Sequence, residues 1–134
     1  MADAAPSFPR EFLDQLQRSK KLYVATLRKD GKPSAAAPVW FAVMDNSIWF
    51  ATRSTSHKAK RVKRGSPMLI SIQGAEGPFT TVRAGVVKDG AIADRLGKLY
   101  AEKYWMAWLG MFRPSHEKIE NGTDILIHLT PDPR

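Results

Sequence analysis

The sequence contains no cysteine, and this absence excludes both a disulfide framework and a thiolate metal site. No segment approaches the roughly 20 apolar residues that a membrane-spanning helix needs. The opening residues MADAAPSFPREF carry acid and proline where a secretory signal needs a basic start and an apolar run. We therefore expect a soluble protein of the reducing cytoplasm, with no membrane partner.

Internal repeats, linkers and low-complexity segments are also missing. The chain has 134 residues, of which 43% are hydrophobic and 25% charged, as is typical of a globular protein rather than a disordered one. This length supports one hydrophobic core and is too short for two. We expect residues 1–134 to form a single domain.

Acidic residues are absent from residues 53–64, which carry six of the lysines and arginines. These six account for most of the formal net charge of +8, so the positive charge is a local feature and not a general coat. A nucleic-acid-binding protein would combine such a helix with exposed aromatic residues for stacking. Most aromatic residues here fall inside strand patterns, and we expect no nucleic-acid partner.

The hydrophobic pattern predicts strands with helices between them. Residues 9–20 and 57–64 have helical spacing, and residues 90–112 form the longest predicted helix. Alternation predicts strands within residues 21–43, where Asp30-Gly31 marks a hairpin, and within 44–53, 66–74, 78–90 and 123–129. Pro38 inside one of these strands indicates a sheet edge or a bulge. The pattern favours a small, mainly β barrel of six strands with helices at its openings.

The segment TRSTSHK combines three hydroxyl side chains with a lysine between a strand and a helix. Ser54, Thr55, Ser56, the free amides of a helix start and Lys58 are together suited to hold a phosphate. The alternative is that Ser56 only caps the helix and that the cations form a solvated face.

The order and spacing of VATL, PVWF, FATRSTSHKAKRV and SPMLISI resemble the flavin-binding split-barrel family related to pyridoxamine 5'-phosphate oxidase. The resemblance runs from about Lys21 to Val87. It implies a six-stranded antiparallel split β-barrel with flanking helices. It also implies a homodimer with two cofactor sites at the subunit interface.

The resemblance further implies roles for particular residues of this sequence. By this resemblance Ser56, His57 and Lys58 would bind the phosphate of the flavin, and Thr52 would lie beside its ribityl chain. A bulged backbone runs along the isoalloxazine ring, and a threonine, Thr80 or Thr81, reaches the ring from the partner subunit. The bulged segment comprises Ala37, Pro38, Val39, Trp40 and Phe41. The alternative for Trp40 and Phe41 is an ordinary place in the core.

Two departures from the pyridoxamine phosphate oxidases bear on the substrate. Those oxidases resemble one another in having a lysine against the cofactor, and this chain has Phe41 at that position. The sequence also ends at Arg134 without their C-terminal extension. We therefore do not expect a vitamin B6 oxidase.

Two cofactors remain open. The hydroxyl-rich segment favours FMN, whereas a branch of the same superfamily that this chain resembles equally well uses the deazaflavin coenzyme F-420, whose tail carries glutamates. The basic residues exceed what one phosphate needs, and the surplus would suit such a tail or serve only solubility. These cations are Lys58, Lys60, Arg61, Lys63 and Arg64.

The expected function is hydride transfer between a bound flavin and a small conjugated or apolar acceptor. We expect no carboxylate around the two candidate segments and only one histidine, His57, so no side chain is an obvious general acid or base. A non-catalytic flavin or haem-binding protein is the alternative, with His57, His116 or His128 as the axial ligand. The three scattered histidines lack the paired spacing of a zinc helix, and we expect no metal site.

Overall fold

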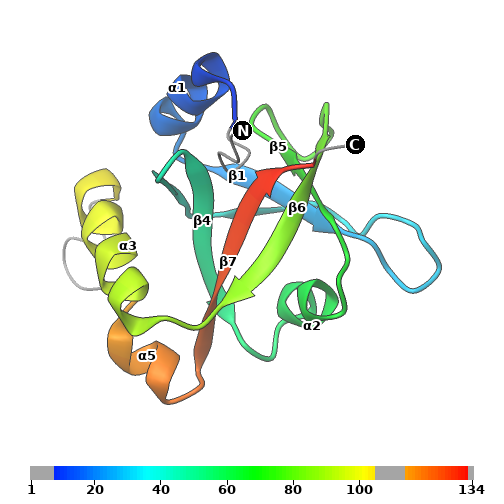
Figure 1. Cartoon of the computed structure of the whole chain (residues 1–134). Helices are drawn as coiled ribbons and strands as arrows, with labels where there is room; N and C mark the ends of the chain where they lie inside the picture. The colour runs from blue at the N-terminus through cyan, green and yellow to red at the C-terminus, as the bar shows by residue number, and fades with distance from the viewer. Residues whose placement is uncertain (1–7, 105–113, 133–134) are drawn as a thin grey trace, which may run out of the picture.

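The computed structural model describes residues 8–104 and 114–132. Four helices and seven strands occur in this part of the chain (Figure 1). In chain order they are α1 (Arg10–Arg18), β1 (Leu22–Thr26), β2 (Ala37–Val39), β3 (Ala42–Met44), β4 (Ser47–Arg53), α2 (His57–Lys63), β5 (Met68–Ser71), β6 (Thr80–Val87), α3 (Gly90–Lys103), α5 (His116–Glu120) and β7 (Asp124–Pro131).

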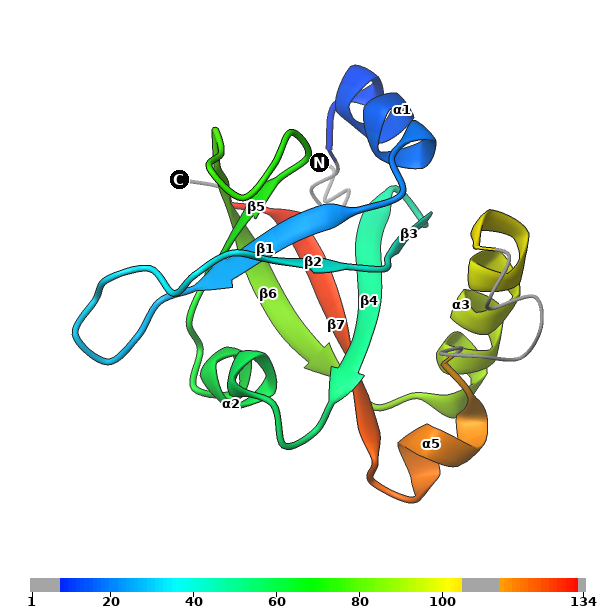
Figure 2. The same ribbon diagram turned by 180° about the vertical axis from the view of Figure 1, so that it is seen from behind.

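All the strands belong to one antiparallel sheet with the order β2-β1-β5-β6-β7-β4-β3. The two edge strands, β2 and β3, follow each other in the chain and are joined only by Trp40 and Phe41. The sheet therefore curls round until its edges meet, which makes the predicted barrel (Figure 2). The prediction of a mainly β barrel is confirmed, with seven strands instead of six because one predicted strand is broken in two.

The barrel interior holds the main hydrophobic core. Alternate residues of each strand point inward, and Phe50 of β4 lies opposite Ile127 of β7 in the ladder. Both side chains are fully buried. Pro38 lies in the edge strand β2, opposite Tyr23, so its missing N–H group leaves no unpaired position inside the sheet.

Helices α1 and α2 lie at opposite ends of the barrel, as predicted (Figure 1). Leu13 and Leu16 of α1 join the main core, and so do Ala59 and Val62 of α2. Gly65 ends α2 with a φ of 93°, the left-handed conformation that glycine adopts most readily.

Helix α3 packs against the outside of the sheet and forms a second hydrophobic cluster there. Leu96 and Tyr100 of α3 contact this face, where Trp49 and Leu126 are buried. The predicted helix over 90–112 is wrong at its end, because α3 stops at Lys103 and Tyr104 has extended backbone angles. Residues 105–113 lie outside the described part of the chain.

The short helix α5 was not expected from the sequence. Its N-cap is Ser115, whose hydroxyl accepts a hydrogen bond from the Lys118 amide. Helix α5 lies beside α3 and leads into β7 (Figure 2). In the part of the chain that the structure describes, no helix is long and apolar enough to span a membrane.

Candidate functional site

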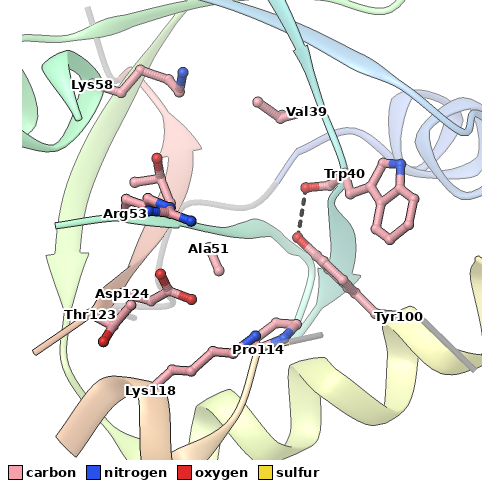
Figure 3. A pocket seen from close by; sticks show the side chains of 11 residues that line it. Val39, Trp40, Ala51, Arg53, Lys58, Tyr100, Pro114, Lys118, Thr123 and Asp124 are labelled. Atoms are coloured by element: carbon pink, nitrogen blue, oxygen red, sulfur yellow. Dashed lines mark hydrogen bonds between the residues drawn. The ribbon is translucent and has the colours of Figure 1, made fainter. Parts of the chain in front are cut away.

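An open pocket of about 550 Å³ lies on the outer side of the barrel, where β4 and the break between β2 and β3 face α3 and α5. Side chains from six segments line it (Figure 3). They are Val39, Trp40, Ala51, Thr52, Arg53, Lys58, Tyr100, Pro114, Lys118, Thr123 and Asp124. The volume is within the usual range for small-molecule sites, roughly 300–1,000 Å³.

One wall of the pocket is built on the break in the sheet at Trp40 and Phe41. The hydroxyl of Tyr100 donates to the Trp40 carbonyl at 2.6 Å. The Tyr104 hydroxyl accepts a hydrogen bond from the Phe41 amide at 3.2 Å and donates to the Lys20 carbonyl at 2.7 Å. These tyrosines replace ladder partners at the break, so two side chains near the end of α3 hold the backbone there.

The same tyrosines pack against the Trp40 ring, which turns away from the pocket (Figure 3). The ring of Trp40 stacks on Tyr104 with centroids 4.4 Å apart and lies edge-on to Tyr100 at 6.2 Å. Burial raises the pKa of Tyr100 far above its ordinary value, and a backbone hydrogen bond with Ala51 opposes this only in part. The Tyr100 hydroxyl therefore stays protonated and acts as a donor, not as a base.

Two cations lie across the pocket from this wall (Figure 3). Arg53 ends β4, and Lys58 is in the first turn of α2. Neither side chain forms a hydrogen bond or an ion pair with another residue of the described chain. This end of the pocket is suited to an anionic group.

The hydroxyl groups beside these cations are engaged with each other. Thr52 donates to the Ser56 hydroxyl at 3.1 Å, and that oxygen accepts from the Ala59 amide at 3.0 Å. Ser56 therefore caps α2, as the alternative interpretation predicted. Ser54 bonds instead to the carbonyls of Gly122 and Thr123. The phosphate role of the hydroxyl groups remains a prediction.

The third side of the pocket comes from residues that the sequence analysis did not select. Asp124 begins β7 directly opposite Arg53 of β4, and Lys118 projects from α5. The statement that no carboxylate is near the candidate segments is thus wrong for the folded chain. Asp124 is remote in sequence from both segments, and only the pairing of β4 with β7 brings it there.

The other predicted site residues lie outside the pocket. Phe41 is fully buried in the main core, which confirms its core interpretation. Arg61 reaches back to β1, where its guanidinium donates to the Thr26 hydroxyl at 2.9 Å. Ala37 and Pro38 belong to the edge strand, and Thr81 lies in β6. The side chains of His57, Lys60 and Thr81 are exposed, and their contacts with a cofactor or a partner remain predictions.

None of the three histidines lines the pocket. His57 is exposed beside it, whereas His116 pairs with Glu120 at 2.7 Å on the surface of α5. His128 stacks on Trp49 with centroids 4.1 Å apart, and burial lowers the pKa of its imidazole. Within the described residues, no group of three acidic or histidine side chains is arranged to hold a metal ion.

Comparison with solved structures shows the same fold in several proteins. Protein Rv2991 of Mycobacterium tuberculosis, a conserved hypothetical protein, has 19% identity and a TM-score of 0.69, with 98% of this chain and 85% of that chain covered. An F420 reductase has 22% identity and a TM-score of 0.61, with 93% and 96% covered. The haem storage protein HutZ of Vibrio cholerae has 15% identity and a TM-score of 0.63, with 96% and 92% covered.

No curated protein sequence matches the chain. A family model does match it over residues 8–132, which is almost the whole sequence, and the model is that of pyridoxamine 5'-phosphate oxidase. The match includes the barrel, both helices at its openings and every described residue that lines the pocket. By this match the chain belongs to the pyridoxamine 5'-phosphate oxidase family of split barrels.

Proposed function

We propose that the protein is an oxidoreductase that binds FMN or a deazaflavin and transfers hydride between it and a small conjugated or apolar acceptor. The observation that carries this proposal is the division of the pocket into an apolar wall and a cationic end. A flavin has the same division, with a flat ring system at one end and an anionic group at the other. The solved F420 reductase with the same fold gives this proposal further support.

The side chains present fit such a cofactor. Val39 and Ala51 offer an apolar surface for a ring, whereas Trp40 presents its carbonyl to the pocket and its indole turns away (Figure 3). Arg53 and Lys58 have no acidic partner in the described chain, so they can pair with a phosphate or a carboxylate without first breaking an ion pair. Thr52 lies between the two groups, and its hydroxyl oxygen, whose proton is donated to Ser56, can accept a hydrogen bond from a polar linker.

A bound flavin supplies the redox chemistry, and the residues of the chain orient the reactants and handle the proton. Tyr100 keeps its proton and fixes the Trp40 carbonyl. Asp124 is the carboxylate of the pocket and is only partly exposed, so we assign proton transfer to it or to water that reaches it.

We place FMN first and the deazaflavin second. The phosphate of FMN needs few cations, and Arg53 with Lys58 meets that need within the pocket. The glutamate tail of the deazaflavin would extend over α2, where Lys60, Lys63 and Arg64 are exposed. The two cofactors therefore differ in how many cations outside the pocket they use.

Absorbance of the purified chain and titration with each cofactor test the proposal. FMN should bind to the wild-type chain and to a Lys60→Ala/Lys63→Ala variant with nearly equal affinity. Deazaflavin affinity should fall in that variant, and the loss should increase with tail length and at low salt. Reduction of the bound cofactor followed by oxidation with a quinone or a nitroaromatic compound tests hydride transfer. Failure to bind either cofactor would overturn the proposal, and binding without turnover would favour a non-catalytic flavin protein.

The haem alternative has less support from the site. HutZ and a flavocytochrome, Anf3 of Azotobacter vinelandii, share the fold, but none of the histidines of this chain lines the pocket. A haem absorption band in the purified protein would favour haem binding over the flavin-dependent function.

We also propose the homodimer that the family resemblance implies, with the cofactor at its interface. Phe79, just before β6, is 38% exposed, more than any other large hydrophobic side chain of the described residues. Burial of this ring against a second copy would remove apolar surface from water. Light scattering measures the mass directly, and a monomer that binds flavin tightly would contradict the shared site.

A further inference from the structure

A second pocket, of about 430 Å³, lies between α1 and α3 and shares no residue with the candidate flavin site. It has an apolar wall from β3 and α3 and a basic side formed by two lysines. The described residues that line it are Gln17, Lys20, Ala42, Val43, Leu99, Glu102 and Lys103.

The two lysines are held together at the point where α1 and α3 end. The Lys20 ammonium donates to the carbonyl oxygen of Lys103. The Lys103 ammonium lies 3.5 Å from the centroid of the Phe41 ring and donates to the Leu16 carbonyl at 3.3 Å. Neither lysine forms an ion pair with an acidic residue of the described chain. Two lysine amines therefore lie beside one cavity, and neither is paired with a carboxylate.

This setting changes the acid–base behaviour of Lys103. Burial in the first place, and the charge of Lys20 in the second, lower the pKa of Lys103 to about 8. Glu102 of α3 is the acidic residue on the pocket, whereas the α1 and β3 residues that line it are uncharged. At pH 7.5 a much larger fraction of Lys103 is then neutral than of an ordinary lysine.

We propose that this pocket is a covalent binding site for a small 2-oxo acid. In it the amine of Lys103 condenses with the carbonyl carbon, and Lys20 pairs with the carboxylate of the ligand. A desolvated lysine beside a second cation is the usual arrangement of an amine that forms a Schiff base. The apolar wall of Ala42, Val43 and Leu99 fits a short alkyl group.

The condensation is balanced without a further reactant. The Lys103 nitrogen forms a bond to the carbonyl carbon, and the carbonyl oxygen takes up a proton to give a carbinolamine. This oxygen then takes a second proton from solvent and leaves as water, and a protonated imine remains. Nothing is oxidised or reduced, so the step is independent of a flavin and does not rest on the proposed function.

Trapping of the imine tests the proposal on the wild-type chain. The protein is incubated at pH 7.5 with pyruvate and cyanoborohydride, and the modified lysines are identified by peptide mass spectrometry. Lys98, an exposed residue of the same helix, is the internal control. Labelling of Lys103 should exceed that of Lys98 on the order of tenfold, because its neutral fraction is larger. The excess should shrink as the pH approaches 10. Labelling of Lys103 no faster than of Lys98 would overturn the proposal.

A neutral probe separates the role of Lys20 from that of the amine. Propionaldehyde has the same carbon chain as pyruvate but no carboxylate. In the wild-type chain the ratio of pyruvate to propionaldehyde labelling should be several-fold higher at Lys103 than at Lys98. A Lys20→Gln variant should bring the two ratios together. Equal ratios in the wild-type chain would remove the 2-oxo acid as the ligand and would leave Lys103 as a reactive amine only.

Discussion

Tyr104 holds the break in the barrel, and its replacement by phenylalanine is the most direct test of the fold. Its hydroxyl accepts from the buried Phe41 amide at 3.2 Å and donates to the Lys20 carbonyl at 2.7 Å. Only 6% of Tyr104 is exposed, and burial raises the pKa of its hydroxyl to about 12. This hydroxyl therefore stays protonated over the whole physiological range.

Tyr104→Phe removes one oxygen and keeps the ring that stacks on Trp40. The Phe41 amide then loses its hydrogen bond in a buried position, and such a loss costs about 1 to 3 kcal/mol. For a chain of this size the change corresponds to a fall in melting temperature of about 4 to 12 °C. Urea unfolding should show a lower midpoint with an unchanged m-value, because the surface exposed on unfolding is the same.

Tyr23→Phe is the matched control. Tyr23 lies in β1, is half-buried, and its hydroxyl forms no hydrogen bond within the described residues. The control should change the free energy of unfolding by less than about 0.5 kcal/mol. Equal losses in the two variants would show that the Tyr104 hydroxyl does not hold the break, and the account of the pocket wall would be wrong.

Two further predictions concern charged residues at the two pockets. Lys58→Ala should weaken binding of FMN by about 1.5 to 3 kcal/mol, and Lys60→Ala, outside the pocket on the same helix, should not. Equal effects of the two variants in a calorimetric titration with FMN would favour a diffuse basic surface. Burial lowers the pKa of Lys103 to about 8 in the folded chain, against an ordinary 10.5. Between pH 8 and pH 10.5 the unfolded chain therefore binds more protons than the folded chain, and the free energy of unfolding should rise with pH over this range. In Lys103→Met this rise should be smaller in urea unfolding at pH 7, 8, 9 and 10, and an unchanged rise would mean that the lysine is not buried in solution.

Much of the local structure was predictable because it depends on neighbours in the sequence. Asp45 and Asn46 form a turn with φ values of 54° and 60°, a conformation that short polar residues adopt readily. Ser56 and Gly65 flank α2 and so mark the two limits of the helix predicted over residues 57–64. The alternating strands were found for the same reason, since a strand that is buried on one face has a period of two.

The parts of the site that the sequence did not predict depend on contacts between residues that are distant in the sequence. Asp124 enters the pocket because β7 pairs with β4, and no short-range pattern reports that pairing. The end of α3 was missed because helical spacing continues through Tyr104. There the gain from stacking on Trp40 and bonding to Phe41 exceeds the gain from one more helical residue. Arg61 was assigned to the cofactor because its charge is visible in the sequence, but its hydrogen bond to Thr26 is not.

The break between β2 and β3 serves both the closure of the barrel and the pocket. A continuous strand over residues 37–44 would have to pair with β1 along its first half and with β4 along its second half. The sheet closes because the chain turns from one neighbour to the other at Trp40 and Phe41. Backbone groups at that turn need partners from outside the sheet, and α3 supplies them through Tyr100 and Tyr104. Because Tyr100 also lines the pocket, the residues that complete the barrel also shape the surface on which a flat ligand would lie.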